Sequence, residues 1–396
     1  MALGLTPEHL ELAAAVRGWS QRHCPEAVVR ASADAADGGA ERYRTELAPA
    51  LAELGLFGLH LPEADGGEGF GLPELALALE ELGRALLPGA FLPTVLAAAV
   101  LAEAAAANRA ALDTDAAAPK LVARLAAGSL TGTVCLATGL TGTRTKNGGL
   151  TVRGEAGPVL AGPLADLIIA AVAATDGEAW VALESSDLAV AEVKALDLAR
   201  PLGTMRADGV TVPADRVLAG IDRTAVTSLA AIMFGAEACG IADWAVQTAA
   251  DYAKIRYQFG RPIGQFQAVK HRCARMLTGA ERAAAAVWDA ARSAPGGERE
   301  FAAAVAAVVA VDAAVEAAND CIQTLGGIGY TWEHHAHLYY RRALSLRALL
   351  GPSQRWCERL AALAITGNVP AISTELPDGD AEFRAQVRAE LPRSAR

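Results

Sequence analysis

The chain has few cysteines and no excess of basic residues. Its 396 residues include six cysteines, and none of them forms a Cys-x-x-Cys pair. This spacing argues against a disulfide scaffold and against a zinc site, and it fits a reducing, cytoplasmic setting. Asp and Glu outnumber Lys and Arg by 45 to 35, which gives a net charge of -10. Because binding to nucleic acid requires a basic face, we expect no nucleic acid among the partners.

The sequence also lacks the hydrophobic runs that a signal peptide or a membrane span requires. Two glutamates and an arginine within the first 20 residues argue against a signal peptide. The longest apolar stretch, 302–318, is mostly alanine and is interrupted by Asp312 and Glu316. We interpret such stretches as too weakly apolar to span a membrane. They predict buried helices and no membrane partner.

Helical periodicity dominates the first part of the chain. Apolar residues recur at helical spacing over four stretches, and a turn rich in Gly and acidic residues at 62–69 follows the second of them. The predicted helices cover 6–35, 43–56, 73–86 and about 92–107. They predict an N-terminal helical domain over residues 1–125.

Between Leu130 and Leu218 the pattern changes to short β-branched or aromatic runs, separated by Gly, Asp and Pro turns. The predicted strands lie at 133–137, 150–154, 166–170, 180–183 and 209–212. They predict a middle β domain over residues 126–220, built as a small barrel or sandwich.

Helical spacing returns after Thr224 and continues almost to the end of the chain. The predicted helices cover roughly 225–256, 265–293, 298–324 and 338–365. The third should end at a glycine cap formed by Gly326 and Gly327. The four helices predict a C-terminal bundle over residues 221–370. A loose tail that is rich in Pro, Asp and Glu follows over 371–396.

The most informative segment joins the first two of these long helices. Residues 256–267 read Arg-Tyr-Gln-Phe-Gly-Arg-Pro-Ile-Gly-Gln-Phe-Gln. One interpretation is an ordinary helix–loop–helix in which Pro262 stops the first helix. The other is a diphosphate site, because the guanidinium of Arg256 can bind two phosphate oxygens at once.

A second glycine-rich segment follows the third long helix. Residues 323–333 read Gln-Thr-Leu-Gly-Gly-Ile-Gly-Tyr-Thr-Trp-Glu. Paired glycines let the backbone approach a ligand closely, because no Cβ stands in the way. The alternative is a glycine cap that binds nothing.

In this order, the two segments resemble the R-x-Q-F-G-x-P-I-x-x-F-Q and Q-x-x-G-G-x-G-[YF]-x-x-E signatures of the acyl-CoA dehydrogenase family. Residues 61–69, 80–84 and 197–200 are similar to its P-E-x-x-G-G-x-G turn, its E-E-L-G-R and its D-x-[ST]-R. The resemblance covers nearly the whole chain and implies an α+β multidomain fold. In the family, an N-terminal helical domain precedes a middle β-barrel or sandwich domain and a C-terminal four-helix bundle.

The resemblance also implies FAD as the cofactor and an oligomeric protein. In the family the arginine, here Arg256, reaches the pyrophosphate of a flavin that belongs to a neighbouring subunit. Gln323 and the backbone of Gly326 and Gly327 would meet the adenosine and ribitol-phosphate end. The cofactor-binding residues that we predict are Arg256, Gln258, Phe259, Gln267, Gln323, Gly326, Gly327 and Thr138, with no metal site.

Thr138 marks the first departure from the family pattern. In the family, a middle-domain strand leads into a loop resembling T-E-P-x-A-G-S-D, which holds the isoalloxazine. Here the strand 134–138 is followed by Gly-Leu-Thr-Gly-Thr-Arg. Of that loop motif the chain keeps only the threonine, Thr138, with its hydroxyl.

The second departure is the catalytic base. The family reaction removes a proton α to a thioester while the β-hydride moves to the flavin, and the weakly acidic C–H needs a positioned carboxylate. Most members carry this glutamate in Y-E-G-T, where the chain has Leu350; a minority carry it just before an arginine, and at those two positions the chain has Ala230 and Ala231. We therefore predict no catalytic residue in this chain. The acids weighed as substitutes are Glu237, which better resembles a structural glutamate, and Asp243, Glu333 and Glu358.

Two further groups follow the second glycine segment. We interpret His334, His335 and His337 as a solvated or substrate-facing helical surface rather than as a metal site. A basic group either faces phosphate or an acidic partner, or lies on a solvated helix face. It consists of Arg341, Arg342, Arg347 and Arg355.

The residues that would bind the flavin of a neighbouring subunit are kept. The middle-domain loop and the catalytic base, which the chain's own site would need, are lost. The chain thus resembles the base-lacking subunit of heteromeric acyl-CoA dehydrogenases of actinobacterial steroid degradation. This resemblance implies α,β-dehydrogenation of a bulky acyl-CoA, such as a steroid side-chain thioester, in an α2β2 assembly. A homologous subunit would supply the glutamate, and an electron-transfer flavoprotein is a candidate partner. The alternatives are a flavin monooxygenase of the same fold, which needs no such base, and a non-catalytic structural subunit.

Overall fold

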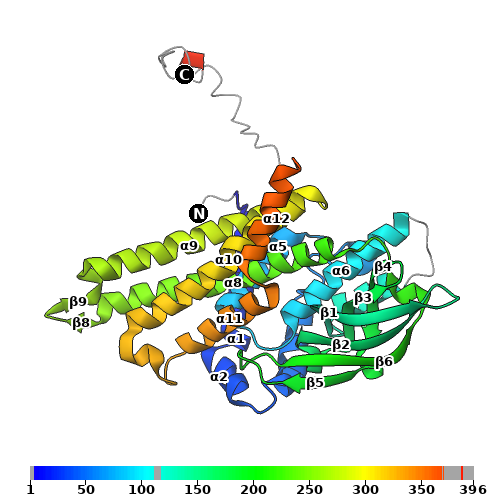
Figure 1. Ribbon diagram of the computed structural model, residues 1–396. Helices are drawn as coiled ribbons and strands as arrows, with labels where there is room; N and C mark the ends of the chain where they lie inside the picture. Colours follow the sequence, from blue (N-terminus) through cyan, green and yellow to red (C-terminus); the bar gives the residue numbers. More distant parts are fainter. Residues whose placement is uncertain (1–3, 111–116, 368, 370–384, 387–396) are drawn as a thin grey trace.

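The computed structural model describes residues 4–110, 117–367, 369 and 385–386. Helices, strands and helices follow one another along the chain, in the order that the sequence predicted. Figure 1 shows the long C-terminal helices side by side, with the sheet near one end and the small hairpin β8–β9 at the other. Apart from 385 and 386, the tail predicted at 371–396 lies outside the described residues.

The N-terminal part is helical. Its helices are α1 (Pro7–His23), α2 (Glu26–Asp34), α3 (Ala40–Arg42), α4 (Ala48–Glu53), α5 (Leu72–Arg84), α6 (Phe91–Ala110) and α7 (Ala118–Ala126). The helix predicted over 6–35 is two helices, because Pro25 lacks the N–H that would continue the hydrogen-bond ladder. The hydroxyl of Thr6 caps α1 by accepting from the backbone N–H of His9. The sequence did not predict α7.

The middle strands hydrogen-bond into one mixed sheet, in the order β5-β6-β2-β1-β3-β4-β7. Its strands are β1 (Gly132–Arg144), β2 (Leu150–Leu160), β3 (Leu167–Ala174), β4 (Gly177–Glu184), β5 (Ala189–Val193), β6 (Leu202–Val212) and β7 (Val217–Leu218). β1 and β3 are parallel, and the other neighbours are antiparallel. The sequence missed the two edge strands, because β5 is mostly exposed and β7 has only two residues.

Alternate residues of the sheet belong to two different cores, as the two-residue period of a strand requires. Val134, Ile169 and Trp180 belong to the core that the sheet shares with the helices. Their chain neighbours Cys135 and Val181 belong to a second core, which consists of sheet residues. One face of the sheet is therefore fixed against the helical part of the protein.

β1 continues through the residues that correspond to the family's flavin loop. Its pairing with β3 shifts register between Cys135 and Leu140, and β1 then pairs with β2 as far as Arg144. Residues 139–144 therefore form strand, not a ligand-binding loop. Thr138 lies, exposed, in the irregular stretch between the two registers.

The C-terminal part consists of long helices. These are α8 (Arg223–Ile255), α9 (Gln267–Arg292), α10 (Gly297–Leu325), α11 (Ala336–Leu350) and α12 (Ser353–Ile365), with the hairpin β8 (Tyr257–Gln258) and β9 (Arg261–Pro262) between α8 and α9. The helix predicted over 338–365 is two helices, because Gly351 (φ +87°) ends α11 and Pro352 precedes α12. α10 ends at Gly326 with φ +66°, where glycine is favoured, as predicted.

Three helical segments are long and apolar enough to cross a membrane by length and composition: α6, α8 and Gly297–Tyr330. The interpretation of such stretches as too weakly apolar was therefore wrong. Their most apolar windows are 78%, 89% and 67% buried inside the protein. This hydrophobicity serves the packing of the bundle.

A buried group of charges joins the sheet to the helices. Glu237 on α8 accepts hydrogen bonds from Nη1 and Nη2 of Arg200 at 2.7 and 2.5 Å, and from Nη1 of Arg342 on α11 at 2.7 Å. Nε of Arg342 also donates to Asp197. Arg342 is 0% exposed. These contacts fix the sheet, α8 and α11 relative to one another.

The structure corrects the prediction of a single basic group after the second glycine segment. Arg342 is buried in the charge group, Arg341 donates to the carbonyl of Leu196 at 3.3 Å, and Arg347 lies 3.6 Å from Asp312. His334 and His335 precede α11 rather than lying on a helix, and His337 is in its first turn. The arginines and histidines that follow the second glycine segment are close in sequence but lie in different environments in the structure.

Candidate functional site

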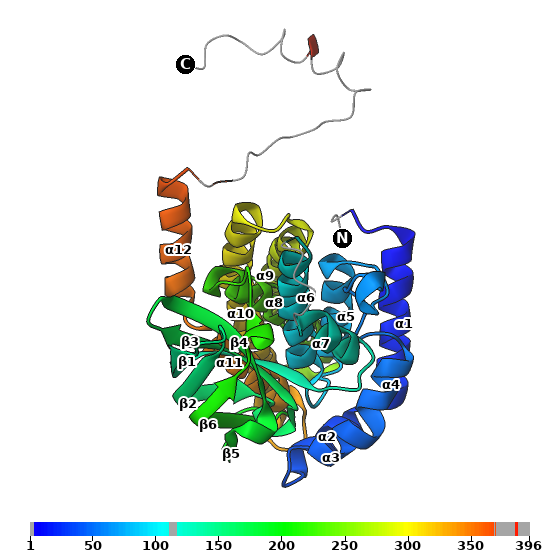
Figure 2. The ribbon, with the colours of Figure 1, turned by 90° about the vertical axis from the view of Figure 1, so that its right-hand side faces the viewer.

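A cleft of about 680 Å³ lies between the sheet and the C-terminal helices. β1 and β2 form one side, and α8, the end of α11 and α12 form the other. Figure 2 shows α12 rising beside the strands. The lining residues are Val134, Leu136, Ala137, Pro158, Leu160, Arg223, Thr224, Thr227, Phe234, Ala348, Leu349, Leu350, Gly351, Arg355, Trp356 and Arg359.

Leu350, which stands at the family's usual base position, is part of this wall. Its carbonyl accepts a hydrogen bond from the indole N–H of Trp356 at 3.3 Å. Its side chain is an alkyl group and cannot exchange a proton. Ala230 and Ala231 are fully buried in α8 and do not line the cleft. Neither position presents an ionisable group to the cleft.

The cleft contains cations but no acid among its lining residues. Arg223 donates to the carbonyl of Leu136 at 3.2 Å and pairs with Glu178 at 2.5 Å. Arg223 thereby connects the start of α8 to β1 and β4. Such a group can bind an anion, but it cannot act as a general base.

The other two arginines of the cleft, Arg355 and Arg359, come from α12. Arg359 donates to the hydroxyl of Thr224 at 2.9 Å and pairs with Glu300. Within the part of the chain that the structure describes, the guanidinium of Arg355 has no hydrogen bond or ion pair. The α12 side of the cleft is therefore positively charged.

The acids considered as substitute bases lie elsewhere. Burial alone would raise the pKa of Glu237, but Arg200 and Arg342 outweigh it and hold the pKa below its ordinary value. Asp243 pairs with Arg84, away from the cleft. Glu333 and Glu358 are not lining residues, and Glu358 accepts from Gln354. We find no substitute for the missing base among the described residues.

Most predicted cofactor-binding residues gather at the hairpin end of the bundle. Arg256, Gln258 and Gln267 are exposed there, and Phe259 on the hairpin is 92% exposed with a positive φ of 52°. Gln323 at the end of α10 is exposed as well, and its amide donates to the hydroxyl of Tyr330 at 2.5 Å. These side chains face outward from the chain rather than into a cavity of its own.

This end of the bundle has features that a phosphate ligand requires. The guanidinium of Arg256 has no acidic partner among the described residues. A Cβ added at Gly326 or Gly327 would meet nothing within 4 Å, so the backbone there is open to close approach. These residues fit the diphosphate end of FAD.

Thr138 does not join this group. It lies on β1, beside the cleft residue Ala137, whereas Arg256 follows the last residue of α8. α8 begins in the cleft with Arg223 and has 33 residues, so its ends are about 50 Å apart. Figure 1 shows the two regions at opposite ends of this helix. The eight predicted residues therefore belong to two separate sites.

Comparison with known proteins shows the family of the chain. The family model for the N-terminal domain of acyl-CoA dehydrogenases matches residues 6–113, and the model for the C-terminal domain matches residues 224–364. The chain belongs to the acyl-CoA dehydrogenase family. Members of the family are oxidoreductases that act on CH–CH groups with a flavin acceptor.

Two relatives of this acyl-CoA dehydrogenase family member come from Mycobacterium tuberculosis. The chain is 37% identical to the acyl-CoA dehydrogenase FadE34 over 93% of its own length but only 49% of FadE34, so it spans about half of that relative. It is 34% identical to the acyl-CoA dehydrogenase IpdE2 over 86% of its length and 92% of IpdE2.

Two solved structures share the fold. A variant of the Tcur3481–Tcur3483 steroid ACAD matches with a TM-score of 0.81 at 27% identity, covering 92% of this chain and 99% of that chain. The ChsE4–ChsE5 complex from Mycobacterium tuberculosis matches with a TM-score of 0.82 at 24% identity, covering 94% and 100%.

Sequence reasoning named Arg355, as part of the basic group, but missed the other polar residues that line the cleft of this acyl-CoA dehydrogenase-family chain. Arg359 lies four residues after Arg355 and three after Trp356, so the three side chains lie on one side of α12. Arg223 directly follows Asp222, the cap of α8. The helical spacing on α12 could have been recognised, but no motif marks Arg223.

Proposed function

We propose that this chain is the base-lacking subunit of a heteromeric, FAD-dependent acyl-CoA dehydrogenase. A homologous subunit supplies the catalytic glutamate, and this chain completes the flavin site of that subunit. The substrate is a bulky acyl-CoA, such as a steroid side-chain thioester, and an electron-transfer flavoprotein takes the electrons.

One observation carries the proposal. The cleft between the sheet and the C-terminal helices has no carboxylate among its lining residues. The opposite end of the bundle displays two open glycines and Arg256, which has no acidic partner among the described residues. Loss of a general base costs about two to four powers of ten in rate. A chain with this cleft alone is therefore a poor dehydrogenase.

The roles of this chain's residues follow from the hairpin end. FAD, when bound, supplies the acceptor for the hydride. The guanidinium of Arg256 would bind the pyrophosphate through two N–H groups. Gln323 and the backbone at Gly326 and Gly327 would bind the adenosine and ribitol-phosphate end, and the exposed ring of Phe259 would exclude water from the flavin.

The relatives support the heteromer and the class of substrate. One structural relative is named as a steroid ACAD of Tcur3481 with Tcur3483, and another as the complex of ChsE4 with ChsE5. FadE34 is about twice as long as its matched part, which leaves room for a second unit of this size. All three relatives are consistent with a subunit that functions together with a second unit.

Counting flavin tests the proposal. The chain should be purified alone and after co-expression with candidate partner chains of the acyl-CoA dehydrogenase family from the same genome. We expect two FAD per four chains in the complex, with dehydrogenation of a bulky acyl-CoA only there. Stoichiometric FAD and turnover from the chain alone would contradict this function.

The same preparation separates the alternatives. Oxygen uptake with externally reduced flavin, without oxidation of the thioester, would indicate a flavin monooxygenase. A complex without flavin absorbance would indicate a structural subunit.

A further inference from the structure

A second cavity, of about 280 Å³, lies where α1, α5, α8 and α9 meet. It shares no lining residue with the cleft or with the hairpin end of the bundle. An inference about this cavity therefore does not rest on the proposed function.

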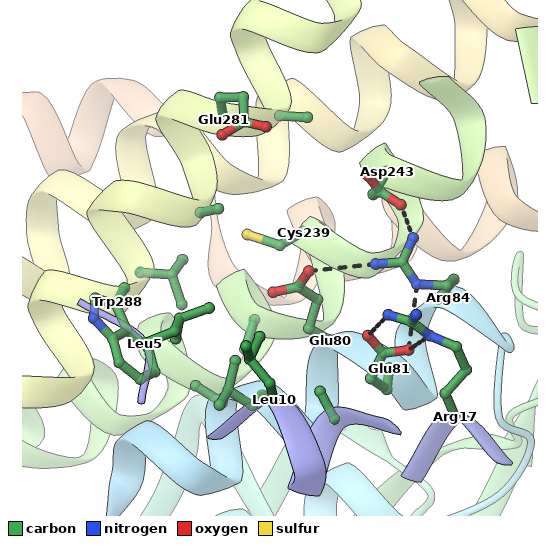
Figure 3. Close-up of a pocket in the computed structure, with 17 residues that line it drawn as sticks. Leu5, Leu10, Arg17, Glu80, Glu81, Arg84, Cys239, Asp243, Glu281 and Trp288 are labelled. Atoms are coloured by element: carbon green, nitrogen blue, oxygen red, sulfur yellow. Dashed lines mark hydrogen bonds and ion pairs between the residues drawn. The ribbon is translucent and has the colours of Figure 1, made fainter. Parts of the chain in front are cut away.

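The two ends of the cavity differ in polarity. Leu5, Leu10 and Trp288 form an apolar end, and Figure 3 shows them together on one side. Glu80 and Glu281 lie toward the other side, with their carboxylates directed at the intervening space. A ligand that fills both ends must itself have an apolar part and a polar part.

The charges around the polar end do not balance. The lining residues include two guanidiniums and four carboxylates, which are Arg17, Arg84, Glu80, Glu81, Asp243 and Glu281. Both guanidiniums already have partners: Arg17 donates twice to Glu81, at 2.8 and 2.6 Å, and Arg84 pairs with Asp243. An excess of two negative charges remains.

This excess lies on Glu80 and Glu281. Glu80 has a single ion pair, at 3.4 Å, to an Arg84 that also serves Asp243 and Glu81. Glu281 is exposed and has no ionic partner among the described residues. One carboxylate is thus weakly paired, and the other faces the cavity from an exposed position without a counter-ion.

A buried side chain between these carboxylates is also without a partner. The thiol of Cys239 points into the space between Glu80 and Glu281 in Figure 3, and it makes no hydrogen bond within the described part of the chain. Cys239 is 3% exposed. Burial raises the pKa of Glu80, and the charges of Glu81 and Glu281 add to this effect against those of Arg84 and Arg17. The site therefore disfavours negative charge and would be stabilised by a positive one.

We propose that this cavity binds a small organic cation, an amine with a compact apolar body. Its ammonium group donates hydrogen bonds to Glu80 and Glu281, and its apolar body packs against Leu10 and Trp288. A bare metal ion fits less well, because the described residues contain no group of three His, Cys, Asp or Glu side chains that could hold one. It would also leave the apolar end unfilled.

Three probes of similar size and different charge test this proposal on the full chain in the assembly in which it purifies. Calorimetric titration at pH 7.5 compares 2-phenylethylamine, 2-phenylethanol and 3-phenylpropanoate. We expect saturable binding of the amine, binding of the alcohol that is weaker by about tenfold or more, and no binding of the acid. Equal affinity for amine and alcohol, or no saturable binding of the amine, would overturn the proposal.

Variants locate the binding. Glu281→Gln should weaken amine binding by about tenfold and leave alcohol binding unchanged, whereas Glu298→Gln, at a likewise exposed position that does not line the cavity, should change neither. Ala284→Phe fills the cavity and should abolish binding of both, with thermal melting as the check of folding. If Glu281→Gln or Ala284→Phe binds the amine as the unchanged chain does, the ligand lies elsewhere and the proposal fails.

Discussion

Arg342 donates a hydrogen bond to Glu237 at 2.7 Å in the interior of the protein, where neither side chain is more than 2% exposed. The contact joins α11 to α8, and Asp197 and Arg200 extend it to the segment before β6. Buried charges are costly unless they are paired, so this group can exist only with all its members in place.

Replacing Arg342 by methionine should therefore destabilise the chain. The change leaves Asp197 without its guanidinium and Glu237 with only Arg200. We expect a loss of about 3 to 5 kcal/mol in the free energy of unfolding, measured by urea denaturation. Arg341→Met is the matched control, because Arg341 makes only an exposed bond to a carbonyl and should cost less than about 1 kcal/mol.

Replacing Arg256 by glutamine should remove flavin from the assembled protein. Bonds to a charged group contribute about 1.5 to 3 kcal/mol, so FAD affinity should fall by about ten- to a hundredfold. Stability should not change, because the side chain is exposed and has no acidic partner among the described residues. Lys254→Gln, two residues earlier, is the control. Unchanged flavin content in Arg256→Gln, measured by absorbance, would remove Arg256 from the flavin site.

Introducing a carboxylate into the cleft by Leu350→Glu tests whether only the base is missing. We expect no turnover from the variant chain alone and unchanged turnover in the heteromer, because the flavin-holding loop after Thr138 is also replaced by strand. The measurement is acyl-CoA oxidation with an artificial electron acceptor. Dehydrogenation by the variant alone would show that the cleft still binds flavin and substrate.

Acid should destabilise the protein through His60. Burial lowers the pKa of this histidine to about 4, outweighing the backbone of Val95, which raises it, and both ring nitrogens are buried. In the unfolded chain the pKa is about 6.5, so below that pH the unfolded state takes up the proton first. With respect to His60, the folded protein therefore has its full stability above pH 6.5. As the pH falls from 6.5 toward 4, the free energy of unfolding decreases by up to about 3 kcal/mol.

Urea denaturation between pH 4 and 7.5 measures the slope of the free energy of unfolding against pH. We expect His60→Leu to flatten it, whereas His271→Leu, at an exposed position, should leave it unchanged. Equal slopes in His60→Leu and in the unchanged chain would assign the acid sensitivity to other groups.

The sequence predicted the order of elements because helical and strand periodicities differ strongly here. It also located the glycine cap at Gly326, where a positive φ leaves glycine favoured. It failed where a single residue interrupts a pattern: Pro25 and Pro352 each divide a predicted helix. It also missed β7, because two residues carry no periodic signal.

The candidate sites were predictable to different degrees. The hairpin residues were identified by a contiguous motif, since one turn of chain brings them together. The arginines of the cleft come from α8 and α12, which only the folded chain brings together. Arg342 was taken for a surface cation, because nothing local in the sequence shows that Glu237 and Asp197 lie next to it.

The length of α8 has an evolutionary consequence. One unbroken helix carries the cleft at its first turn and the hairpin after its last, so substitutions at one end leave the contacts of the other unchanged. After a gene duplication, selection could relax on the cleft of one copy while it continued to act on the hairpin. Two copies could then divide between them what each once did alone.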